Sequence, residues 1–164
     1  LCNRAWSNHL QCNRLIEQEN VSEARAKLQK YEHYWNRFNT HKKGAEMEKN
    51  MLKATEKSAL KADDANGGKF IALASEYLGK AVRTVVACRR ALSWTYVHAY
   101  FMEDKNDREL FEFQQGALET AVENLSYLLE KSSADGAQIV NLAAVAVTMA
   151  SRVLEAGAEG VSMF

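Results

Sequence analysis

The chain has 164 residues, 47% of them apolar, and its 21 Lys and Arg residues balance its 21 Asp and Glu residues. A chain of this length and composition can bury a sizeable core, so we expect one compact domain. The zero net charge excludes a global attraction to nucleic acid or to an anionic membrane. No uninterrupted apolar run approaches a membrane span, and no signal peptide opens the chain. We therefore predict no nucleic-acid and no membrane partner, and a cytoplasmic protein, with the nucleus left open as a second compartment.

The first dozen residues contain Cys2, His9 and Cys12 in the spacing Cys-x6-His-x2-Cys. Thiolate and imidazole groups are the ligands that tetrahedral zinc takes, but a closed structural site needs four of them. We therefore expect the fourth ligand upstream and interpret the chain as the C-terminal piece of a longer protein. Two alternatives stay open on spacing alone: a chance cluster, or a site completed by His33 or His41.

The chain has no proline and few glycines, which is typical of long helical segments. Apolar residues at intervals of three and four residues predict amphipathic helices separated by polar links. The helices are expected at 21–40, 45–62, 70–99, 111–131 and 139–154, with Gly44 as a break or bend between the first two. We predict an all-α fold, an elongated bundle of four to five helices with a short zinc-site remnant at its N-terminus. The helix at 70–99 is its central element, and Cys88 within it is expected to be a buried thiol rather than a nucleophile.

Five glutamates on the predicted fourth helix share one narrow stripe of its surface. They are Glu109, Glu112, Glu119, Glu123 and Glu130, and no basic residue lies between Glu109 and Lys131. A solvated face is the simplest interpretation, yet such faces usually alternate with Lys or Arg. This acidic stripe would be better placed beside positive charge.

An aromatic cluster occupies the first predicted helix. Its periodicity assigns Tyr31, Trp35 and Phe38 to the core. Tyr34 and His33 point elsewhere, and we expect them either to form a contact surface or to be incidentally exposed.

Four groups of residues together resemble the Ariadne domain at the C-terminus of RING-between-RING E3 ubiquitin ligases. They are Cys2-x3-Trp6-x2-His9 with Cys12-Asn13-Arg14; Lys30-Tyr31-x-His33-Tyr34-x-Asn36-Arg37; Cys88-Arg89-x2-Leu92-x-Trp94-Thr95-Tyr96-x2-Ala99-Tyr100; and Leu110-Phe111-Glu112-x-Gln114-Gln115-x2-Leu118-Glu119-x3-Glu123-x-Leu125-Ser126. The resemblance covers most of residues 1–130. Beyond Asp135 the usual basic run of the last helix is replaced by Ala-rich sequence, so the match there is one of length and periodicity.

The resemblance implies a parent enzyme that transfers ubiquitin from an E2 through a thioester cysteine upstream of this chain. It makes Cys2, His9 and Cys12 the last zinc ligands of the catalytic RING2 module, and it assigns an autoinhibitory contact with that module to His33, Glu112 and Glu123. Its implied partners are an E2 enzyme, ubiquitin, the RING2 module in cis and a neddylated cullin-RING complex.

The expected domains are the RING2 remnant at 1–14 and the helical domain at 15–160. The alternative is a stand-alone helical adaptor that binds a basic partner through its acidic stripe. No convergent set of acid and base residues accompanies the metal ligands, which disfavours a metal-dependent enzyme in its own right.

Overall fold

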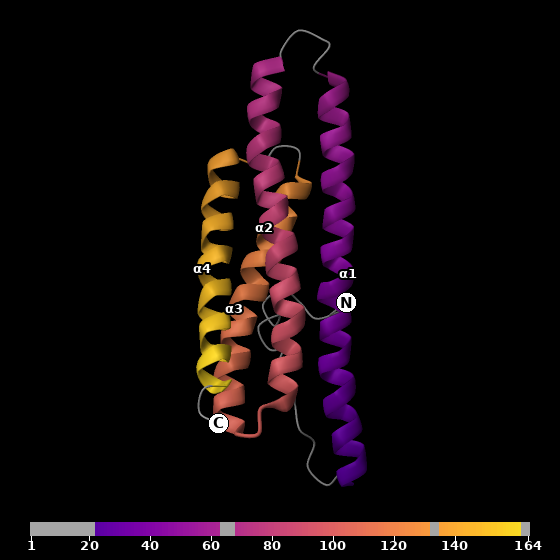
Figure 1. The fold of residues 1–164 in the computed structure, drawn as a ribbon, viewed down its shortest axis with the longest axis vertical. Helices are drawn as coiled ribbons and strands as arrows, with labels where there is room; N and C mark the ends of the chain where they lie inside the picture. Colours follow the sequence, from indigo (N-terminus) through magenta and orange to yellow (C-terminus); the bar gives the residue numbers. More distant parts are fainter. Residues whose placement is uncertain (1–21, 63–67, 132–134, 162–164) are drawn as a thin grey trace.

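The computed structural model describes residues 22–62, 68–131 and 135–161, and all of its regular structure is helical. Four helices follow one another: α1 (Glu23–Ala62), α2 (Gly68–Phe101), α3 (Lys105–Glu130) and α4 (Gly136–Val161). The long pair α1 and α2 lies side by side, and the shorter α3 and α4 pack on the other side of α2 (Figure 1). The predicted all-α, elongated bundle is confirmed. The predicted zinc-site remnant lies outside the described residues.

The prediction of a break at Gly44 is wrong, because α1 continues through this position for 40 residues. The missing side chain serves packing instead. A Cβ atom at Gly44 would lie 3.1 Å from the Arg89 side-chain Cδ and 3.2 Å from one guanidinium nitrogen. Gly44 thus leaves room for Arg89 to pass across α1 toward α3.

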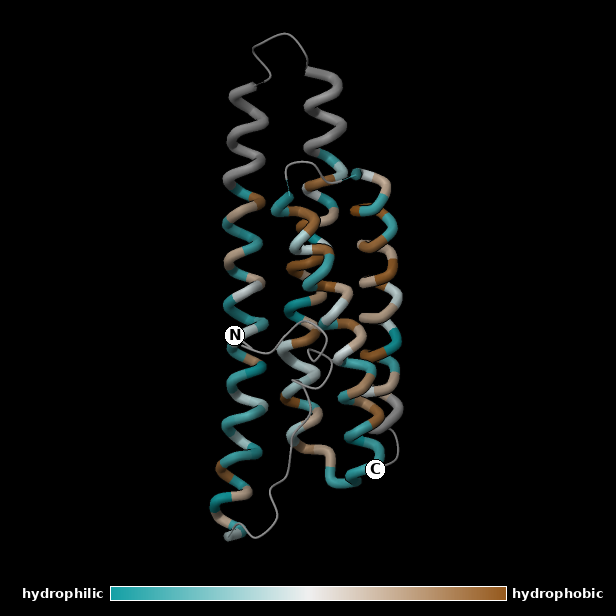
Figure 2. Tube along the Cα trace, turned by 180° about the vertical axis from the view of Figure 1, so that it is seen from behind, coloured by the Kyte–Doolittle hydropathy of each residue, from teal (hydrophilic) through white to brown (hydrophobic). Residues whose placement is uncertain are grey.

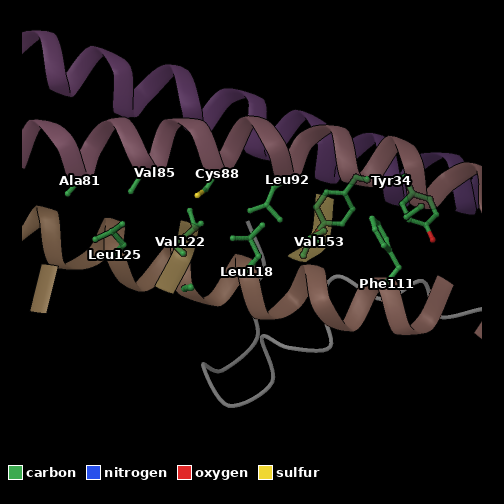
Figure 3. Packing of buried hydrophobic residues seen from close by; sticks show 14 of the residues in the cluster. Tyr34, Ala81, Val85, Cys88, Leu92, Phe111, Leu118, Val122, Leu125 and Val153 are labelled. Carbon is green, nitrogen blue, oxygen red and sulfur yellow. The ribbon is translucent and has the colours of Figure 1, made fainter. Parts of the chain in front are cut away.

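The apolar core is built on α2, which packs against each of the other three helices, as predicted for the central helix. Val85, Leu92 and Tyr96 of α2 are fully buried. Val85 and Leu92 face apolar residues of α3, among them Leu118 (Figure 3). Helix α4 closes the core with one buried side chain every seventh residue, at Ile139, Ala146 and Val153. Its small residues permit close packing, as expected from the sequence.

Helix α1 is the most polar part of the bundle (Figure 2). Its backbone packs along α2 but stays apart from the backbone of α3 over the described residues. The buried positions of α1 include Tyr34, His41 and Glu48, which carry polar atoms. Long polar side chains therefore make the connection between α1 and α3.

The expected assignment of the α1 aromatic residues is reversed in the structure. Tyr34 is buried, whereas Tyr31 and Trp35 are each about half exposed. The buried face of α1 follows Tyr34, His41, Ala45 and Glu48, and only Ala45 of these four lacks a polar side-chain group. Apolar periodicity cannot detect such a face, because it weighs only apolar residues.

Helix α4 has a length and composition that would also allow it to cross a membrane, over Gly136–Ala158. The sequence analysis considered only uninterrupted apolar runs, and this window is interrupted by Gln138, Asn141, Arg152 and Glu155. In the bundle its inner face is buried against α2 and α3, while Val140, Val147 and Leu154 are exposed. Length and apolar composition alone are weak grounds for a membrane span.

We predict that Leu118→Ala lowers the free energy of unfolding by about 2 to 5 kcal/mol, because it leaves a cavity at a fully buried position. The matched control is Leu110→Ala on the same helix, where the side chain is 60% exposed. Urea denaturation followed by circular dichroism measures both. Equal losses for the two variants would contradict this description of the core.

Candidate functional site

The acidic stripe of α3 lies against basic and hydroxyl groups of α1 and α2. Its middle members Glu112, Glu119 and Glu123 face these helices, whereas Glu109 and Glu130 at its ends are exposed. The expected neighbouring positive charge is therefore present, and it comes from the same chain. The interpretation as a solvated face holds only for Glu109 and Glu130. Glu112 and Glu119 are largely occupied within the bundle, and Glu123 is the central carboxylate that stays substantially exposed.

Helix α3 begins at a defined N-cap. The Asp104 carboxylate accepts hydrogen bonds from the backbone N–H groups of Asn106 and Asp107, at 2.8 and 2.9 Å. Such a cap satisfies backbone donors that would otherwise lack partners in the first turn. The cap fixes where α3 starts, and the contacts along the helix determine which of its faces turns toward α1 and α2.

Glu112 is 2% exposed and accepts a hydrogen bond from the Tyr34 hydroxyl at 2.5 Å. The His33 ring contacts the Tyr34 ring edge to face, with 5.0 Å between the ring centres. His33, Tyr34 and Glu112 thus form one continuous contact between α1 and α3. It joins two of the three residues assigned to the autoinhibitory contact.

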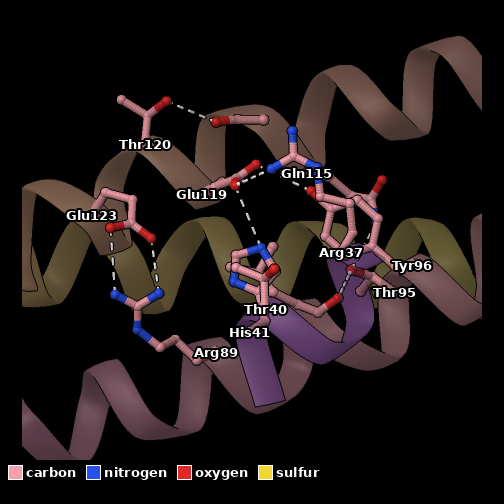
Figure 4. A network of polar contacts seen from close by, with 12 residues as sticks. Arg37, Thr40, His41, Arg89, Thr95, Tyr96, Gln115, Glu119, Thr120 and Glu123 are labelled. Carbon is pink, nitrogen blue, oxygen red and sulfur yellow. Dashed lines mark hydrogen bonds and ion pairs between the residues drawn. The ribbon is translucent and has the colours of Figure 1, made fainter. Parts of the chain in front are cut away.

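Glu119 receives three side chains from two helices (Figure 4). The Arg37 guanidinium lies 3.0 Å from one carboxylate oxygen, and the Tyr96 hydroxyl donates to the other at 3.1 Å. His41 Nε2 lies 3.5 Å from the first oxygen, which is an ion-pair distance if the imidazole is protonated. The fully buried His41 ring stacks on Tyr96, with 5.5 Å between ring centres.

These contacts determine the ionisation of the cluster. Burial raises the pKa of Glu119, but His41, Arg37 and the Tyr96 hydrogen bond together outweigh it and hold this pKa below its ordinary value. Burial, followed by the charge of Glu119, raises the pKa of Tyr96 well above its ordinary value. Glu119 therefore stays an acceptor and Tyr96 a donor through the neutral range.

Glu123 forms a two-pronged ion pair with Arg89 of α2, at 2.8 and 3.4 Å (Figure 4). The same guanidinium lies 3.6 Å from Glu48 of α1, whose carboxylate accepts a hydrogen bond from Ser126 of α3. Arg89 thus joins α1, α2 and α3 at one point. The Glu123 side chain is still 42% exposed, so it remains open to a further partner.

Cys88 and His98 of α2 lie in apolar surroundings. Cys88 is buried and burial raises the pKa of its thiol, as expected for a structural cysteine. His98 lies against the Phe111 ring. Cys2, His9 and Cys12 fall outside the described residues. Within the described residues, no group of three metal-ligating side chains occurs.

The sequence analysis missed the partners of the carboxylates. Arg37 and Arg89 appeared only within family motifs, His41 appeared only as a possible zinc ligand, and Glu48 was not singled out. A signal was present, since a glutamate stripe without lysines requires cations from another helix and Arg37 lies one turn before His41. The pairing itself depends on how α1 is rotated against α3, which the sequence does not specify.

We predict that Glu119→Gln lowers the free energy of unfolding by about 1 to 3 kcal/mol at pH 7, because Arg37 loses a partly buried ion pair. The pKa of Glu119 is lower in the folded state than its unfolded value of about 4.3. The stabilisation that ionised Glu119 gives to the fold is therefore complete above the unfolded pKa, and it is lost as the pH falls through the folded pKa. The gap between wild type and variant should therefore narrow below about pH 4.

Thermal denaturation between pH 7 and pH 3 tests this, with the exposed Glu109→Gln as the matched control. A gap that is independent of pH would show that folding does not lower the pKa of Glu119.

Comparison with known proteins identifies relatives of this four-helix arrangement. The Ariadne domain family matches residues 29–155. The E3 ubiquitin-protein ligase dbl4 of Schizosaccharomyces pombe is 33% identical over 145 residues, which is 82% of this chain and 28% of that protein. The E3 ubiquitin-protein ligase ARIH2 of Mus musculus is 30% identical over 142 residues, 80% of this chain and 28% of that protein.

The E3 ubiquitin-protein ligase ariadne-1 of Drosophila melanogaster is 33% identical over 141 residues, 80% of this chain and 27% of that protein. The chain thus spans less than a third of the length of these relatives. The family match extends from α1 through most of α4 and includes every residue of the carboxylate contacts described above. The chain belongs to the Ariadne domain family of E3 ubiquitin ligases.

Proposed function

We propose that this chain is the autoinhibitory and partner-docking helical domain of a RING-between-RING E3 ubiquitin ligase. The observation that carries the proposal is the family match over 29–155 together with relatives that are named E3 ubiquitin-protein ligases. The parent enzyme would take ubiquitin from an E2 onto a thioester cysteine upstream. Cys88 is unsuited to that step, because it is buried and its pKa is raised.

The proposed inhibitory surface consists of His33, Glu112 and Glu123; Glu112 lies beneath it, buried against Tyr34, and Glu123 is partly exposed. His33 and Glu112 meet at Tyr34, and Glu123 lies 11 positions further along α3, about 16 Å away at 1.5 Å per residue. In the closed state the RING2 module would cover this surface and its cysteine would be shielded from acceptor lysines. The partly exposed Glu123 can accept a donor from that module while it keeps Arg89.

Release requires a partner that binds the open state more tightly. A shift from mostly closed to mostly open needs several kcal/mol of differential affinity. A neddylated cullin-RING complex is the proposed source, through contacts that the closed form does not offer. Substrate ubiquitination would then depend on docking.

The proposed zinc site in the preceding module would use Cys2, His9 and Cys12, with its fourth ligand upstream. Zinc there would be structural, holding the end of the module in place. Residues 15–160 would then form the helical domain, a range that contains the family match over 29–155.

We predict that the isolated chain carries less than one equivalent of zinc, because three ligands leave one position to water. Elemental analysis of the purified chain measures the content, and Cys2→Ser should lower it further while Cys88→Ser leaves it unchanged. Tight one-to-one zinc in the isolated chain would contradict the missing upstream ligand and would direct attention to His33 or His41.

We predict that Glu112→Ala combined with Glu123→Ala accelerates ubiquitin discharge by the full-length protein, by about fivefold or more. The reason is the loss of carboxylates that hold the closed state. Discharge from a charged E2 to free lysine is measured at a single enzyme concentration.

Two control variants separate the inhibitory contact from damage to the bundle. Tyr34→Phe removes the hydrogen bond to Glu112, and Arg89→Gln removes the ion pair with Glu123, but both variants keep the two carboxylates. Discharge should stay slow in these controls. If they accelerate discharge as much as the double variant, then loosening of the bundle explains the effect and the inhibitory contact is wrong.

A further inference from the structure

An aromatic groove runs along the surface between α1 and α2, with a volume of about 310 Å³. Tyr31, Trp35 and Phe38 of α1 form one wall, and Trp94 and Phe101 of α2 form the other. Trp94 is 66% exposed and Phe101 is 72% exposed. The described residues that line the groove include no charged side chain. Large exposed apolar patches of this kind mark interaction sites.

The rings support one another in a continuous series. Tyr31 stacks on Trp35 and Trp35 on Phe38, with 6.0 and 5.9 Å between ring centres. Phe38 meets Trp94 of α2 edge to face at 5.6 Å. Aromatic side chains held in this way offer large contact areas and lose little freedom on binding. The groove is therefore already shaped for a ligand.

Two ammonium groups lie on the rings of this groove. Lys30 Nζ is 5.3 Å from the centre of the Tyr100 ring, and Lys42 Nζ is 5.7 Å from the centre of the Phe38 ring. The two lysines are twelve positions apart on α1, about 18 Å along the helix axis. An apolar groove with a cation near each end fits an apolar segment that carries a carboxylate near each end.

We propose that this groove binds an acidic amphipathic helix of a partner protein. Two neighbouring helices leave a channel into which the side chains of a third helix can pack. About three turns of helix span the distance between the two lysines. Charge disfavours a second copy of this chain as the occupant, because two basic rims would then face each other.

This groove is a different surface from the proposed inhibitory contact. Arg37 and His41 of α1 point toward Glu119 of α3, whereas Trp35 and Phe38 line the side shared with α2. Only Tyr34 takes part in both surfaces. The proposal therefore stands without the ligase mechanism, and a binding test can fail while the discharge test succeeds.

The test is direct binding of labelled synthetic peptides to the 164-residue chain. The probe is a helical peptide of about five turns with Leu on one face and two Glu residues twelve positions apart. A second peptide carries Lys in place of the Glu residues, and a third carries Ser in place of Leu. Fluorescence anisotropy gives the affinity, and the emission of Trp35 and Trp94 reports on the groove itself.

We expect the acidic peptide to bind at least about tenfold more tightly than either of the other two. Trp94→Ala and Phe101→Ala should each weaken its binding about tenfold or more. Lys42→Glu should weaken it about threefold to tenfold, because the Lys42 ammonium lies on the Phe38 ring. Its neighbour Lys43→Glu, about 100° further round α1, should change the affinity less than about twofold. Far-ultraviolet circular dichroism confirms that each variant is folded.

Several results would overturn the proposal. One is no binding of the acidic peptide, or equal binding of the acidic and basic peptides. Another is binding that Trp94→Ala, Phe101→Ala and Lys42→Glu all leave unaltered. A concentration-dependent dimer in sedimentation experiments that Trp94→Ala abolishes would identify a second copy as the occupant instead.

Discussion

The contact between α1 and α3 is the constraint on which the rest of the bundle depends. Their backbones do not approach each other, so the space between them is crossed by long side chains: Tyr34 to Glu112, Arg37 to Glu119, and Glu48 to Ser126. Each crossing removes an ionisable group from water, which is unfavourable unless the group is paired and hydrogen-bonded. The pairing is satisfied only in one rotation of α1 about its axis. The polar contacts therefore specify an orientation that apolar packing along α2 alone would leave less defined.

The sequence predicted the helices and the apolar core with few errors, because both follow from apolar periodicity. Leu118, Val122 and Leu125 of α3 recur at the expected intervals and are fully buried. The errors occur where a polar group takes a core position. Gly44 was interpreted as a break since glycine disfavours helix, but the structure uses its missing side chain to admit Arg89.

The candidate site shows the same division between what periodicity reveals and what it does not. The positions and common face of the five glutamates could be derived from a 3.6-residue repeat, and their lack of nearby lysines correctly indicated cations from elsewhere. Which cations those are could not be derived, because Arg37 and Arg89 lie on different helices and far away in sequence. Tyr34 was misplaced for a related reason. Its ring lies next to α2 while its hydroxyl reaches a carboxylate, so it is neither a simple core residue nor a surface one.

Tyr34 connects the two surfaces proposed above as contact sites, the inhibitory surface and the aromatic groove. Its ring lines the aromatic groove, and its hydroxyl, at the far end of the same rigid ring, holds Glu112. Because the ring is rigid, a displacement of Tyr34 at the groove also moves its hydroxyl, which donates the hydrogen bond to Glu112. Phenylalanine at this position would keep the ring in the groove and remove only the hydrogen bond, whereas alanine would remove both. An effect of groove binding on Glu112 that is lost in both variants passes through the hydroxyl. An effect that is lost only in the alanine variant passes through packing of the ring.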